Sequence, residues 1–221
     1  ATRARSRRSR LLPAEAYNQL LNLEHAEIAR YIQDLEYRRE IDRYGSTLSG
    51  ADLIETALVD NLAKDVGDFL SFSKGKLRDI LHVYAEKYRI ENLKNIVRGI
   101  NQNMDKQNLE RLVCPINDSD KELYNKLYDS KTVEDMISSL EGTSYYNPLK
   151  KALEARNSDS LQPLEDALDL IYYQNLVSNQ PSGGADVEVY RDFVQLKVDI
   201  ANIKTLLRMR HRGIGAHDEL L

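Results

Sequence analysis

The chain has 221 residues, of which 42% are hydrophobic, enough for one large domain or two small ones with a buried core. Its formal net charge of −4 argues against a dedicated nucleic-acid-binding protein, although five arginines and no acid stand in the first ten residues. A single cysteine excludes an internal disulfide, and no run of about 18 apolar residues predicts a membrane span. We therefore expect a soluble, intracellular protein.

After the arginine-rich start, the chain shows the apolar spacing of α-helices almost throughout. Apolar residues recur at three- and four-residue steps over residues 53–66, 77–100 and 200–207. Stretches that break helices stand at residues 45–46, 114–119, 142–144 and 178–184. No stretch shows the alternating, β-branched pattern of a strand. The sequence therefore predicts an all-α protein.

Two of these helical stretches carry the same motif, I-x-N-[IL]-K-x-[IL]-[LV]-R. The first copy spans residues 90–98 and the second spans residues 200–208, so the offset is 110. The shared polar positions are Asn92, Lys94 and Arg98 in the first copy and Asn202, Lys204 and Arg208 in the second. We call this the repeated motif, and a repeat at a fixed offset indicates duplicated structural units.

Similarity between the two halves extends upstream of the repeated motif. Residues 54–58 match residues 164–168 at the same offset, in the pattern L/I-E-x-A-L. Ile32 and Tyr37 match Leu140 and Tyr145 at an offset of 108. From this order we predict a first helical unit at 1–100 and a second at 101–212. Residues 213–221 would begin a third, truncated unit.

The repeated motif has two interpretations. On a helix Asn92 lies at the edge of the apolar stripe, where its amide can hydrogen-bond a neighbouring loop or unit, while Lys94 and Arg98 share a face. The two cations form either a solvated face or a contact with an adjacent helix end or a partner. A buried asparagine with unmade bonds costs about 1–3 kcal/mol, and an exposed ion pair contributes about 0–1 kcal/mol. Asparagine is thus the better structural candidate, with Asn92 and Asn202 in equivalent positions near a contact between units.

The N-x-K-x-x-x-R helices, the L-x-x-x-x-Y turns and the R-x-R-rich opening resemble the C subunits of archaeal A-type ATP synthases, which are related to the d subunits of V-ATPases. The resemblance covers essentially the whole chain. It implies a pseudo-threefold funnel of three helical units, of which about two are present here. It also implies an acid at the position of Asp199, whereas the matching position in the first unit is Arg89.

The resemblance implies a non-catalytic rotor protein of the central stalk that connects the central shaft to the membrane proteolipid ring. Its partners would be the shaft proteins and the ring, with membrane contact only through the ring, no nucleic acid and no cofactor. Arginine forks suit carboxylates and carbonyls on such a partner. The candidate interface residues are Arg3, Arg5, Arg7, Arg98, Arg208, Arg210 and Arg212.

Other kinds of site find little support in the sequence. The four histidines stand apart without the spacing of metal ligands, Gly213–Gly215 lacks the third glycine of a dinucleotide loop, and acidic pairs are typical of solvated helix faces. Two other functions stay open, a generic helical-repeat adaptor and an RNA-associated protein that uses the N-terminal arginines. The 110-residue repeat is longer than the usual 20–50 of adaptors, which favours the rotor protein.

Overall fold

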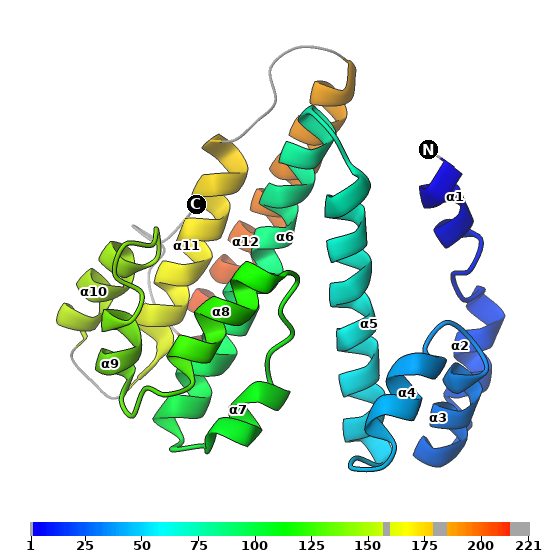
Figure 1. Ribbon diagram of the computed structural model, residues 1–221. Coiled ribbons are helices and arrows are strands. Elements are labelled where there is room, and N and C mark those ends of the chain that lie inside the picture. The colour runs from blue at the N-terminus through cyan, green and yellow to red at the C-terminus, as the bar shows by residue number, and fades with distance from the viewer. Residues whose placement is uncertain (1, 157–159, 179–184, 213–221) are drawn as a thin grey trace. The chain divides into compact units, whose positions relative to one another are not determined.

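The computed structural model describes residues 2–156, 160–178 and 185–212, without the side chains of residues 3, 185–187 and 212. Every regular element in this part of the chain is an α-helix, which confirms the all-α prediction (Figure 1). The predicted start of a third unit, residues 213–221, lies outside the described residues. None of the described helices combines the length and apolarity that a bilayer crossing requires.

The helices follow one another in an order that occurs twice. Four short helices come first: α1 (Thr2–Arg8), α2 (Ala14–Leu20), α3 (His25–Gln33) and α4 (Arg38–Tyr44). Two long helices then follow, α5 (Gly50–Phe72) and α6 (Lys76–Asn101). The second run has four short helices, α7 (Lys106–Arg111), α8 (Asp118–Leu127), α9 (Val133–Ser138) and α10 (Tyr146–Glu154). It ends with the long helices α11 (Gln162–Ser178) and α12 (Ala185–Arg212).

Matching residues of the two runs stand at matching places. Tyr37 precedes α4 as its N-cap residue, and Tyr145 precedes α10 in the same way. The repeated motif lies on the last helix of each run, α6 and α12. The unit boundaries at 100 and 212 stay predictions.

By packing, the chain divides elsewhere, into compact units of residues 1–65 and 66–221. In the first, α3 and α4 pack against each other, and Ala29, Ile32 and Ile41 join Leu53 and Ala57 of α5 in a small core. Apolar residues at helical spacing on two short helices and the start of a long one thus converge on one cluster. The cut falls within α5, so this helix belongs to both units.

The larger unit has its core around α6. Helix α11 packs along α6 and against α10, and both α7 and α9 contact α6 (Figure 1). The first turn of α8 is capped by the Asn117 side chain, and α9 begins with a reciprocal capping box between Thr132 and Asp135. These caps end the loops that place the short helices around α6.

Candidate functional site

The first copy of the repeated motif lies in the centre of the larger unit. Ile90, Leu93, Ile96 and Val97 of α6 are fully buried in the core that α7–α11 complete. Gly99 permits a close approach of α7, because a Cβ at this position would lie 2.3 Å from Cδ2 of Leu109. The apolar half of the motif thus forms the packing axis of this unit.

The amide of Asn92 ties this axis to the loop after α7. Its Nδ2 donates to the carbonyl oxygen of Cys114 over 2.9 Å, and its Oδ1 accepts from the Cys114 backbone N–H over 3.2 Å. The same Nδ2 lies 3.4 Å from the hydroxyl of Tyr124, which is buried on α8. One side chain therefore satisfies both backbone groups of a residue outside any helix.

The two cations of the first copy bind carboxylates on α11. Nζ of Lys94, a buried side chain, lies 2.5 Å from Oδ1 of Asp169. Nε and Nη2 of Arg98 donate to the two oxygens of Glu165 over 2.8 and 2.7 Å. These hydrogen bonds from Arg98 to Glu165 raise the pKa of the arginine. Lys94 and Arg98 thus pair inside the chain, and the first copy presents no free cationic pair to a partner.

A second polar cluster next to this site involves residues that the sequence did not single out. Nε of Arg89 donates to Asp120 over 2.8 Å and its Nη1 to Glu86 over 3.0 Å, while Tyr145 donates to the other oxygen of Glu86. Burial lowers the pKa of Arg89, but the charge of Asp120 and the bonds to both acids raise it overall. The only sequence signal for this cluster is that an arginine, Arg89, precedes the first motif copy at the position where an acid, Asp199, precedes the second.

The second copy of the repeated motif, on α12, has a different environment. Ile203 and Leu207 are 56% and 61% exposed, whereas their counterparts Leu93 and Val97 are fully buried. Asn202 is the equivalent of Asn92 on α12, but it is only half-buried, whereas Asn92 is buried. Lys204 and Arg208 are exposed and make no ion pair with any residue that the structure describes.

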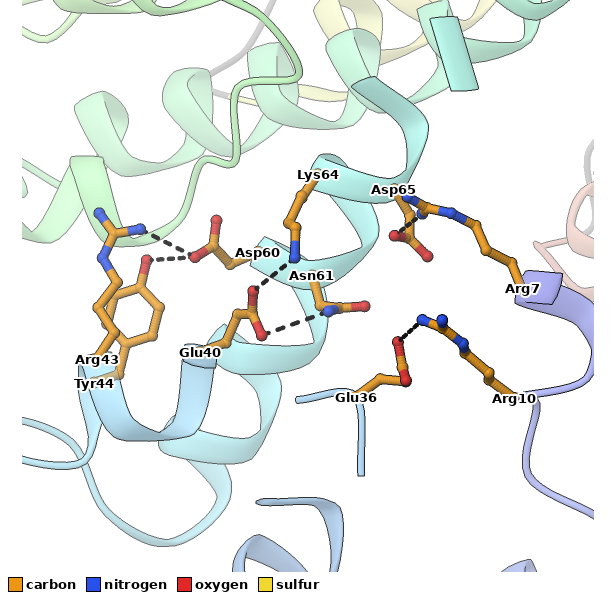
Figure 2. Close-up of polar contacts among 10 residues, drawn as sticks. All are labelled: Arg7, Arg10, Glu36, Glu40, Arg43, Tyr44, Asp60, Asn61, Lys64 and Asp65. Atoms are coloured by element: carbon orange, nitrogen blue, oxygen red, sulfur yellow. Dashed lines mark hydrogen bonds and ion pairs between the residues drawn. The ribbon is translucent and has the colours of Figure 1, made fainter. Parts of the chain in front are cut away.

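The N-terminal arginines divide into bound and exposed side chains. Arg7 pairs with Asp65 on α5, and Nη1 of Arg10 lies 2.8 Å from Glu36 (Figure 2). Arg5 is exposed, as is Arg210 on α12. The side chains of Arg3 and Arg212 lie outside the described residues. Of the candidate interface residues, Arg5, Arg208 and Arg210 therefore have exposed side chains.

Acidic residues on the shorter helices and α5 complete the polar contacts of the N-terminal unit. Asp60 accepts from both Arg43 and Tyr44, and the buried Glu40 faces Lys64 and Asn61 across α4 and α5 (Figure 2). Each acid meets a donor from the neighbouring helix, as buried or half-buried carboxylates require. These contacts hold helices together and assemble no catalytic pair among the residues drawn.

Comparison with known proteins gives a consistent result. The family described as "ATP synthase (C/AC39) subunit" matches residues 1–220. An A-type ATP synthase C subunit from Archaeoglobus fulgidus is 35% identical over 208 residues, 94% of this chain and 59% of the relative. The protein of that name from Haloferax volcanii is 34% identical over 96% of the chain and 61% of the relative. The one from Methanosarcina acetivorans is 32% identical over 100% of the chain and 60% of the relative. The chain thus spans about three fifths of the length of these relatives.

Proposed function

Because the chain belongs to the ATP synthase (C/AC39) subunit family, we propose that it forms the larger part of a non-catalytic central-stalk protein of an A/V-type ATP synthase. This protein would connect the central shaft to the membrane proteolipid ring during ATP synthesis or ion pumping. The observation that carries the proposal is the match of the family over residues 1–220, together with relatives that are named as C subunits of A-type ATP synthases.

The proposed architecture is a pseudo-threefold funnel. The twice-repeated order of four short and two long helices supports it, with unit boundaries near residues 100 and 212. A third unit would begin at about residue 213, and about two fifths of the length of each relative lies outside the match. A funnel of three equivalent units offers one end to a ring and its interior to a shaft.

The proposed partners are the shaft proteins and the proteolipid ring, and the protein would reach the membrane only through that ring. A contact that transmits torque needs a fixed geometry and an interface of at least about 1,000 Å² on each side. Arginines provide directional bonds to carboxylates and carbonyls of a partner. We assign this role to Arg3, Arg5, Arg210 and Arg212. Arg7 and Arg98 are left out because Asp65 and Glu165 already bind their guanidinium groups. Arg208 is left out because it flanks an exposed apolar face of α12 that a further helix can cover.

The test is a charge reversal in the complete protein within the assembled ATP synthase. Arg5, Arg210 and Arg212 are changed together to Glu, and ATP hydrolysis and ATP-driven ion pumping are measured in the same vesicles. We expect pumping to fall strongly while hydrolysis by the soluble motor continues, because single rim charges have mild effects but three reversals oppose the contact. The matched control reverses Lys126, Lys131 and Lys151, which are exposed and outside the proposed interface.

Three results would contradict the proposal. Pumping that survives the triple reversal in an assembled complex removes these arginines from the torque-bearing contact. ATP hydrolysis by the purified protein alone overturns the assignment of a non-catalytic role. Loss of pumping in the lysine control as well would show that net charge, and not the arginine positions, determines the effect.

A further inference from the structure

Helix α12 carries an exposed apolar stripe along most of its length. Its members recur at steps of seven, four, three and four residues, which places them on one face of a helix. They are Val189, Leu196, Ile200, Ile203 and Leu207, each at least 40% exposed. Single exposed apolar residues are common on protein surfaces, but five that share one face of a helix indicate a surface that another element covers.

The adjoining side of α12 already has its neighbours. Tyr190 and Val194 are buried in the core of the larger unit, and the ring of Phe193 lies 5.9 Å from that of Tyr84 on α6. Helix α12 therefore has one face in the core and a second apolar face without a cover among the described residues. An amphipathic helix needs only one such face to fold onto its own unit.

The first copy of the repeated motif shows what covers this kind of face. In α6 the residues equivalent to Ile200, Ile203 and Leu207 belong to the core that α11 completes. The ion pairs define the direction of the covering helix, because Lys94 binds Asp169 and Arg98, one turn further on, binds Glu165, one turn earlier. The two helices therefore run antiparallel, with two cations on one facing two carboxylates on the other.

Helix α12 repeats the half of this contact that α6 supplies. Lys204 and Arg208 have the four-residue spacing of Lys94 and Arg98, and they flank the exposed stripe on one side. Both cations are exposed and have no acidic partner in the part of the chain that the structure describes. The covering element that fits both the apolar stripe and its adjoining charges is therefore the same: an apolar helix with two acids one turn apart, as α11 is for α6.

We propose that the stripe of α12 docks an antiparallel amphipathic helix whose two carboxylates, one turn apart, bind Arg208 and Lys204. We assign this helix to the part of the complete polypeptide that lies outside these 221 residues. The relatives have the necessary length, since about two fifths of each lies outside the match. The inference concerns the chemistry and direction of one contact and holds whether or not the protein transmits rotation.

The test uses the 221-residue chain and a synthetic peptide with the sequence of α11, residues 162–178, as the probe. We expect the fluorescently labelled peptide to bind, and the double change Lys204→Glu with Arg208→Glu to weaken binding at least tenfold. A peptide with the changes equivalent to Glu165→Lys and Asp169→Lys should bind this charge-reversed chain and restore most of the loss. Such reciprocal rescue identifies a direct pairing of charges and excludes displacement of α11 from α6.

The matched control is Arg191→Glu with Lys151→Glu, which makes the same charge change at exposed cations away from the stripe and should leave binding within about twofold. Helix content measured by circular dichroism checks that each variant is folded. The complete protein should bind the peptide at least tenfold more weakly than the 221-residue chain, because its own helix covers the stripe.

Three outcomes overturn the proposal: no binding, binding that is insensitive to the reversal, or equal binding by the complete protein. Dimers of the 221-residue chain that dissociate on Lys204→Glu with Arg208→Glu, seen by sedimentation, would assign the stripe to a second molecule of the chain instead. Peptide binding and ion pumping are independent measurements, so failure here is distinguishable from failure of the proposed function.

Discussion

The repeated motif occurs on α6 and on α12, and the two helices hold it in opposite environments. On α6 its apolar residues are buried and its cations bind acids of α11, whereas on α12 the equivalent residues are exposed. Both helices form, with 26 and 28 residues, so the motif specifies a helix irrespective of its cover. The difference teaches that burial at these positions depends on the element packed against the helix.

The two helices also differ at the residue that follows the motif. Gly99 on α6 admits the side chain of Leu109 from α7, while the equivalent position on α12 is Met209. A methionine excludes so close an approach by a short helix. An α11-like helix can therefore pack on both copies of the motif, whereas an α7-like helix can approach closely only the first copy.

The largest expected difference between the copies is in their apolar residues. Leu93→Ala should lower the free energy of unfolding by about 2–5 kcal/mol, because it leaves a cavity in a closed core. Ile203→Ala, at the equivalent and exposed position, should change it by less than about 0.5 kcal/mol. Urea denaturation followed by circular dichroism measures both. Equal losses would mean that another element covers α12 in solution and that the two copies do not differ in burial.

A smaller effect is expected at the asparagine of the first copy. Asn92→Ala leaves the backbone N–H and carbonyl of Cys114 without their side-chain partner, at a cost of about 1–3 kcal/mol. Asn92→Asp is the informative control, since it keeps an acceptor for the Cys114 N–H and loses the donor to its carbonyl. The same denaturation experiment should rank the alanine variant below the wild type, and an unchanged midpoint would contradict a structural role.

Alkaline pH should act on the covered copy through its tyrosines. Burial raises the pKa of Tyr124 and of Tyr145 above the ordinary value near 10, and Glu86 raises that of Tyr145 further. The folded state therefore holds these protons more tightly, so their contribution is fully present below pH 10 and is lost as the pH rises above it. Each can remove up to about 1.4 kcal/mol per pH unit. Stability measured between pH 8 and 12 should be level and then fall, and a fall below pH 9 would point to other groups.

The smallest difference concerns the arginines. Arg98→Ala removes the two bonds to Glu165, but the arginine side chain is 43% exposed, so we expect a loss of about 0.5–1 kcal/mol. Arg208→Ala removes no ion pair with the described residues and should be neutral within about 0.3 kcal/mol. A double-mutant cycle of Arg98 with Glu165 isolates the coupling, and a value of zero would show that this pair adds nothing measurable.

Local patterns in the sequence predicted much of this fold. The helical spacing, the repeated motif at its offset of 110 and the matching tyrosines before α4 and α10 all depend on neighbours close in the chain. The partners of Lys94 and Arg98 were beyond such reasoning, because Asp169 and Glu165 stand 75 and 67 positions away. Whether Lys94 and Arg98 form a solvated face or a contact depends on how α11 packs.

The Arg89 cluster was missed for the same physical reason. Glu86 precedes it by one helical turn, but Asp120 and Tyr145 come from the starts of α8 and α10. Nothing in the spacing of these residues indicates that they meet. The exposure of α12 could not be predicted either, since its apolar stripe has the same pattern as a covered one.

The bond between Asn92 and Cys114 gives the protein a built-in reporter. Cys114 is the only cysteine of the chain, and this residue lies half-buried in the loop that the asparagine fastens to α6. A thiol reagent reaches such a group through local opening, so the labelling rate follows the population of the opened loop. The labelling rate of Cys114 can therefore be measured in the unaltered protein, both alone and in its assembly, with one thiol reagent. A slower rate in the assembly would show that contacts with partner proteins reduce the opening of this loop.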